Sequence, residues 1–145
     1  MSEANKALVR RAYEGFSEGN VDVIDEVFAP NYVAHYPGVE PMEGSDLAKK
    51  MVGSFIAAFP DIKFTIEDQI AEGDKVCTRW SAKGTHTGEF RGFPQKTHPV
   101  APTGRQVTFS ATDIYLIVDG KIAVEWNSLE QLDVMQQIGV VDVPQ

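Results

Sequence analysis

The chain has 145 residues, of which 43% are hydrophobic and 23% are charged. These proportions are typical of one globular domain spanning residues 1–145, and they exclude a membrane-spanning run and long disordered tracts. Because 13 Lys and Arg stand against 21 Asp and Glu, the formal net charge is -8. A surface of this sign disfavours nucleic acid and anionic membranes as partners.

The N-terminal third of the sequence predicts three helices. Apolar residues recur at helical spacing from Asn5 to Phe16 and again from Asp22 to Phe28, where Pro30 prevents continuation. A third helix is expected from Asp46 to Phe59, and Pro60 closes it. The first helix lacks the apolar core of a signal peptide, and the chain has one cysteine, so we expect a cytoplasmic protein.

The rest of the chain predicts strands, because the apolar period changes from 3.6 to 2 after Pro60. The expected strands are Ile62 to Ile70, Lys75 to His86, Arg105 to Val118 and Lys121 to Asn127. Asp119-Gly120 is a strong signal for a two-residue hairpin turn. Residues 31–43 are expected to form a strand or loop, residues 88–104 a rim loop, and residues 129–137 a final helix.

This order of elements predicts an α+β fold. A curved, mainly antiparallel sheet would pack on the three N-terminal helices. Strong curvature gives such a layer the shape of a cone and leaves a cavity between sheet and helices. We expect the function to reside in that cavity.

Several segments carry a family resemblance across nearly the whole chain. They are Val9-Arg10-Arg11-Ala12-Tyr13, Gly84-Thr85-His86-Thr87-Gly88-Glu89-Phe90, Ile117-Val118-Asp119-Gly120-Lys121-Ile122, Glu125-Trp126 and Leu132-Asp133-Val134-Met135-Gln136-Gln137-Ile138-Gly139. In their order and spacing the chain resembles the SnoaL-like polyketide cyclases, also called ester cyclases, of the nuclear transport factor two-like fold. The resemblance implies an α+β cone without metal or organic cofactor, and a homodimer or higher homo-oligomer formed through the open sheet face.

The resemblance also implies a reaction, the intramolecular aldol closure of a polyketide ester, which starts with removal of a proton next to a carbonyl. In the characterised cyclases the base is an Asp near the end of the last strand, supported by a His on the preceding strand. The ungapped match over residues 117–139 places Asn127 at the Asp position and Asp113 at the His position. An amide is not basic near neutral pH and cannot serve as the general base.

Strand alternation makes Asp113 the most informative candidate. It shares a strand face with Phe109 and Tyr115, so its carboxylate should be costly to ionise unless it is paired. With a raised pKa it could accept a proton near neutral pH, or, held neutral, donate a hydrogen bond to an enolate oxygen. The alternative is a carboxylate satisfied by Trp80 or Asn127 in a non-catalytic pocket.

The candidate catalytic residues are therefore Asp113, Asn127 and His86, and the candidate substrate-binding residues are Tyr13, His35, Met51, Phe55, Trp80 and Phe109. His86 lies beside the rim loop, where its ring either exchanges protons with a ligand or holds the loop. His35 is expected at the pocket mouth, whereas its neighbour Tyr36 is expected only to pack. On the last strand Ala123, Glu125 and Asn127 are expected to share the inner face.

Three functions remain open from the sequence. The first is cofactor-independent acid–base catalysis on a small apolar carbonyl compound, and the second is a non-catalytic protein that binds such a ligand. The third is epoxide hydrolysis, which in this fold uses an Asp-Arg-Asp set, but Arg79 has the opposite strand parity to Trp80. Three scattered His and one Cys offer no metal-ligand spacing, so no metal is expected.

Overall fold

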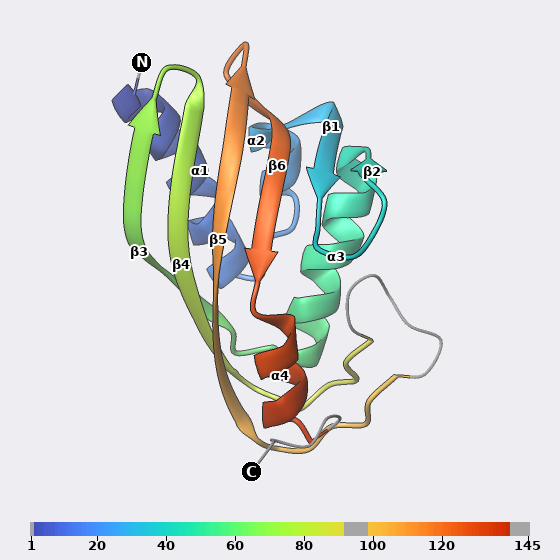
Figure 1. Ribbon diagram of the computed structural model, residues 1–145. Helices are drawn as coiled ribbons and strands as arrows, with labels where there is room; N and C mark the ends of the chain where they lie inside the picture. Colours follow the sequence, from blue (N-terminus) through green and yellow to red (C-terminus); the bar gives the residue numbers. More distant parts are fainter. Residues whose placement is uncertain (1, 92–98, 140–145) are drawn as a thin grey trace.

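The computed structural model describes residues 2–91 and 99–139 (Figure 1). Helices α1 (Ser2–Ser17) and α2 (Val23–Val27) precede strands β1 (Phe28–His35) and β2 (Met42–Glu43) and helix α3 (Ser45–Ala58). Strands β3 (Lys63–Glu72), β4 (Lys75–Thr85), β5 (Gln106–Val118) and β6 (Lys121–Leu129) and helix α4 (Gln131–Gln137) follow. The predicted α+β fold is confirmed.

One sheet of six strands carries the order β2-β1-β6-β5-β4-β3 (Figure 1). The sequence predicted the four antiparallel strands β3 to β6, and β1 adds to them by pairing in parallel with β6. Strand β1 begins before Pro30, where we expected only an interruption. Pro30 is exposed, and the β1–β6 pairing is irregular between Phe28 and Val33, so the missing N–H of proline breaks no regular ladder there.

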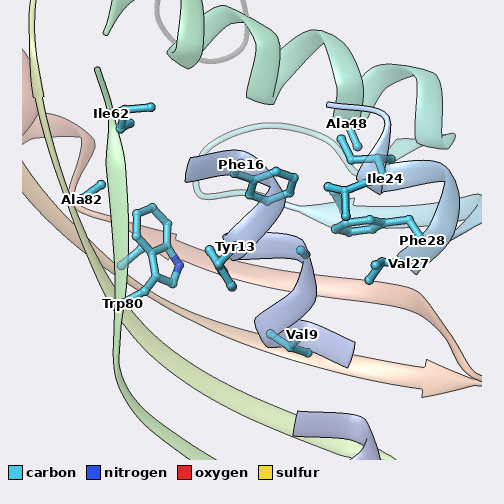
Figure 2. Packing of buried hydrophobic residues seen from close by; sticks show 14 of the residues in the cluster. Val9, Tyr13, Phe16, Ile24, Val27, Phe28, Ala48, Ile62, Trp80 and Ala82 are labelled. Atoms are coloured by element: carbon cyan, nitrogen blue, oxygen red, sulfur yellow. The ribbon is translucent and has the colours of Figure 1, made fainter. Parts of the chain in front are cut away.

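The core lies between the helices and the inner face of the sheet. Along β4 and β5 every second residue is buried, as the period of two predicted. Figure 2 shows Tyr13 and Phe16 of α1 in this layer, with Trp80 of β4 beside Tyr13. The Tyr13 and Trp80 ring centroids are 5.7 Å apart. Helix α1 therefore fixes one wall of the space above β4 and β5.

A register shift changes the inner face of β6. The pairing of β5 with β6 shifts between Leu116 and Ile117, so Ile122 is fully buried while Ala123 is half-buried. The prediction that Ala123 shares the inner face with Glu125 was wrong, because an extra residue in one strand reverses the alternation beyond it. Glu125 stands opposite Tyr115, and Asn127 stands opposite Asp113.

The segment after β4 is held close to helix α3. Backbone N–H groups of Thr87 and Gly88 donate hydrogen bonds to the Ala58 carbonyl oxygen, at 3.2 and 3.1 Å. A Cβ on Gly88 would lie 1.8 Å from the Ala57 carbonyl oxygen, so only glycine allows this approach. The rim loop thus starts at a fixed place. Part of it, residues 92–98, lies outside the described residues.

The outer face of the sheet carries a row of apolar and aromatic side chains. Pairing places Ile70, Cys77, Ile114 and Trp126 next to one another on β3, β4, β5 and β6. Ile70 is 64% exposed, Ile114 40% and Trp126 39%. Within the described residues, no helix is long and apolar enough to cross a membrane.

Candidate active site

A pocket lies between the inner face of the sheet and helices α1 and α3. Its cavity volume is about 80 Å³. Most of its walls are apolar and aromatic. The aromatic lining residues are Tyr13, Phe16, Phe28, Tyr32, Tyr36, Phe55, Phe64, Trp80, Phe109 and Tyr115, and the acidic ones are Asp113 and Glu125.

Asp113 is 1% exposed, and its carboxylate accepts hydrogen bonds from three elements of the fold. The Trp80 indole Nε1–H of β4 donates to Oδ2 at 2.6 Å, and the Asn127 Nδ2 of β6 donates to Oδ1 at 2.7 Å. The Tyr13 hydroxyl of α1 approaches Oδ2 at 3.4 Å. Three donors around one carboxylate hold it in a fixed position and stabilise its ionised form.

Burial and these hydrogen-bond donors act on the pKa of Asp113 in opposite directions. Desolvation in the aromatic pocket raises the pKa of Asp113 to about 6, although the hydrogen bonds from Trp80 and Asn127 act to lower the same pKa. A carboxyl group with this pKa is ionised at neutral pH and is a stronger base than an ordinary aspartate. Its environment therefore suits a proton acceptor that works near neutral pH.

Both ends of the Asn127 side-chain amide form hydrogen bonds. Its Nδ2 donates to Asp113, while its Oδ1 accepts a hydrogen bond from the Leu129 backbone N–H at 2.9 Å. This pair of contacts fixes which end of the amide faces the carboxylate. Asn127 is therefore a positioning residue for Asp113.

Two tyrosines extend the hydrogen-bonded network. The hydroxyl groups of Tyr13 and Tyr115 form a hydrogen bond, and when Tyr13 donates to Asp113, Tyr115 donates to Tyr13. Burial raises the pKa of both tyrosines well above the usual value, so both remain neutral donors across the physiological range. The result is a fixed chain of hydroxyl groups that ends on the carboxylate.

Glu125 is a second buried carboxyl group in the same pocket, only 6% exposed. The Tyr36 hydroxyl donates to its two oxygens, at 3.0 Å and 3.4 Å. Burial raises the pKa of Glu125 well above the usual value, and the negative charge of Asp113 raises it further. We did not single out Glu125 from the sequence, although its spacing of two from Asn127 placed it on the same strand face.

Most of the predicted site residues meet in this pocket, namely Asp113, Asn127, Tyr13, Met51, Phe55, Trp80 and Phe109. His35 does not, because its side chain is on the outer face of β1 and stacks on Trp126, with ring centroids 5.6 Å apart. Tyr36, one residue later, lines the pocket instead. The expected places of His35 and Tyr36 are thus reversed, since neighbouring side chains of an extended segment point to opposite faces.

His86 is fully buried behind the pocket and is not among its lining residues. Its Nδ1 lies 2.9 Å from the Thr103 Oγ1 and accepts a hydrogen bond from the Thr103 backbone N–H at 3.2 Å. The ring packs on Phe59, and burial lowers the pKa of His86. This position matches the alternative in which His86 holds the rim loop.

No cationic side chain lies among the lining residues in the described part of the chain. Arg79, considered for epoxide hydrolysis, is exposed on the opposite face of β4. Within residues 2–91 and 99–139, no three His, Cys, Asp or Glu side chains gather as metal ligands would. The two pocket carboxyl groups are therefore balanced by hydrogen-bond donors alone.

A profile of the family described as SnoaL-like polyketide cyclase matches residues 6–138. The chain belongs to this family. No curated protein sequence matches the chain. Membership of the SnoaL-like family accounts for the fold and for the pocket between sheet and helices.

Solved structures extend the comparison. A proposed polyketide cyclase from Acidithiobacillus ferrooxidans is 31% identical, with a TM-score of 0.78, covering 93% of this chain and 94% of the other. IdmH, a proposed polyketide cyclase from Streptomyces antibioticus, is 30% identical, with a TM-score of 0.74 and coverage of 93% and 98%. AclR, a proposed hydroxylase from Streptomyces galilaeus, is 26% identical, with a TM-score of 0.84 and coverage of 100% and 87%.

An LEH-like epoxide hydrolase from M. tuberculosis, 12% identical with a TM-score of 0.69, shares the fold with this SnoaL-like protein. The match covers 94% of this chain and 90% of the other. At that identity the likeness says nothing about the reaction.

Proposed function

We propose that this protein catalyses cofactor-independent acid–base chemistry on a small, largely apolar carbonyl compound, of the polyketide ester cyclase type. The observation that carries the proposal is the Asp113 carboxylate, buried in an aromatic pocket and held by three donors. With a pKa of about 6, about nine-tenths of this group is ionised at pH 7, and it is ready to accept a proton.

In the proposed reaction Asp113 removes a proton from the carbon next to a carbonyl. The C–H electron pair becomes the C=C bond of an enolate, and the carbonyl pair moves to its oxygen. The enolate carbon then forms a C–C bond with a second carbonyl carbon of the same molecule. The resulting alkoxide takes the proton back from Asp113, so atoms and charge balance and the carboxylate is regenerated.

Asn127 supports this assignment through its contact with Asp113. In the cyclases that the sequence resembles, the last strand carries the base and the preceding strand its partner. We propose that the two roles are exchanged here, with the base on β5 and the positioning residue on β6. The 2.7 Å hydrogen bond from Asn127 is the contact that such an exchange needs.

The experiment is proton exchange at an activated carbon. A 2-substituted 3-oxo ester is incubated with the protein in D2O, and loss of its C2 proton signal is followed by NMR. We expect the wild type to accelerate exchange with a rate that rises through about pH 6, because the ionised carboxylate is the active form. Asp113→Asn should slow the exchange by about 100-fold or more.

Asp61→Asn is the matched control, because Asp61 is a carboxylate outside the pocket whose oxygens bind Thr85. It should leave the exchange rate unchanged.

A second function, ligand binding without catalysis, is favoured by one observation. Asn127 stands where the resembling cyclases have their basic aspartate. If the oxo ester quenches the fluorescence of Trp80, which lines the pocket, yet its C2 proton exchanges no faster than in buffer, the binding role replaces the catalytic one.

A further inference from the structure

The two pocket carboxyl groups differ in how they are hydrogen-bonded. Asp113 is contacted by donors from β4, β6 and α1, with Trp80 and Asn127 at 2.6 and 2.7 Å. In the described part of the chain, Glu125 receives only the Tyr36 hydroxyl, which is shared between its two oxygens at 3.0 and 3.4 Å. The donors around Asp113 therefore stabilise its ionised form, whereas the single donor at Glu125 gives its ionised form much less stabilisation.

The surroundings of Glu125 also oppose its ionisation. The titratable groups that face it from neighbouring elements are the carboxylate of Asp113 and the phenols of Tyr13, Tyr32, Tyr36 and Tyr115. Helix α3 contributes only apolar lining residues, among them Met51 and Phe55. A second negative charge would therefore stand beside Asp113 without a cation among the described lining residues, which is a costly arrangement.

Resting on the proposed function, we propose that Glu125 is a neutral carboxylic acid that donates a hydrogen bond to the ligand's carbonyl oxygen. Glu125 lines the pocket and is only 6% exposed, so a ligand in the cavity can reach its carboxyl group while bulk water is largely excluded from it. Two carboxyl groups whose environments separate their proton affinities divide the roles of acid and base between them. Asp113 then takes the base role and Glu125 the acid role.

In the reaction, the two groups act on the two ends of one carbonyl unit. As Asp113 takes the proton from carbon, negative charge develops on the carbonyl oxygen. The Glu125 O–H donates a hydrogen bond to that oxygen, and the Tyr36 hydroxyl, 3.0 Å from Oε1 and 3.4 Å from Oε2, holds the carboxyl group in place. No proton is lost or gained overall, because Glu125 keeps its own proton while the enolate forms and reacts.

The first test is independent of turnover. Infrared difference spectroscopy on the intact protein should show the carbonyl stretch of a protonated carboxyl group at pH 7, absent from Glu125→Gln and retained in Glu67→Gln. Glu67 is the matched control, an exposed glutamate on β3 that bonds Ser81 outside the pocket. A Glu125 carboxyl that is fully ionised at pH 7 would overturn the proposal.

The second test uses 4-nitrophenolate, whose charged oxygen resembles that of an enolate, in an Asp113→Asn host. The host amide stands in for the protonated base, so the negative probe meets no second charge there. We expect the host to bind the probe, with a shift of its absorbance. Adding Glu125→Leu should weaken binding by about 10-fold to 100-fold, whereas Glu125→Gln, which keeps a neutral donor, should retain most of it.

The outcomes of these tests distinguish the role proposed for Glu125 from the catalytic function proposed for the whole protein. Equal probe affinity in the host and its Glu125→Leu form, or no binding to the host, overturns the role of Glu125 whatever the exchange assay gives. A protonated Glu125 that binds the probe, in a protein that does not exchange the C2 proton, removes the catalytic function alone. Loss of folding in the Leu variant is checked by thermal unfolding, and the isosteric Gln variant then carries the comparison.

Discussion

The raised pKa of Asp113 has a consequence for stability that can be worked out from the structure. Burial raises this pKa from 3.8 to about 6 in the folded protein. Each pKa unit corresponds to about 1.4 kcal/mol, so ionising Asp113 costs the folded state about 3 kcal/mol relative to the unfolded chain. The ionised Asp113 carboxylate therefore lowers the stability of the folded state.

The sign of the pH dependence of stability follows from whether the folded or the unfolded state binds the Asp113 proton more tightly. Well below pH 3.8 Asp113 is neutral in both states and imposes no penalty. As pH rises through about 6 the unfolded chain ionises first, so the contribution to stability is lost over this interval. The free energy of unfolding of the wild type should therefore fall by about 2.5 kcal/mol relative to Asp113→Asn between pH 4 and pH 7.5.

The assay is urea unfolding of both proteins at a series of pH values, because the comparison cancels the titration of all other shared groups. Asp61→Asn is the control for sign. The hydrogen bonds from Thr85, first that of its backbone N–H, lower the pKa of Asp61, so its contribution is present above the unfolded pKa and lost as pH falls. A wild-type to Asp113→Asn difference that stays constant with pH, or that grows in the wild type's favour, would refute the reasoning.

Three further predictions concern the pocket and the outer face. Trp80→Phe removes the donor that lies 2.6 Å from Asp113, so the pH midpoint of the proton-exchange rate should rise above about 6. The free energy of unfolding at pH 7 should fall by about 1.5 to 3 kcal/mol in the same variant. Asn127→Asp replaces a donor by a like charge and should move the same midpoint to higher pH than Asn127→Ala does; equal midpoints would contradict a charge effect. We also propose that the exposed row containing Ile114 and Trp126 meets a second copy of the chain, so sedimentation should show an oligomer in the wild type and a monomer in Ile114→Arg.

The sequence alone determined the parts of this protein that depend on local patterns. Helical spacing located α1 and α3, and the period of two located β3 to β6 and the inner faces of β4 and β5. That alternation places Trp80 and Asp113 on the inner faces of β4 and β5, whereas the place of Asn127 was expected only from the family resemblance. The DG hairpin at residues 119–120 sets the pairing of Ile117 with Ile122, whereas the register shift between Leu116 and Ile117, which no local pattern predicted, brings Asn127 opposite Asp113.

Tertiary structure decided what depends on distant segments. Strand β1 exists because Phe28–His35 pairs in parallel with β6, a contact that no local pattern encodes across Pro30. That pairing turns Tyr36 into the pocket and His35 away from it. The proton affinity of Glu125 depends on its burial and on Tyr36 and Asp113 beside it, because a carboxyl group titrates according to neighbours that the fold assembles from separate elements.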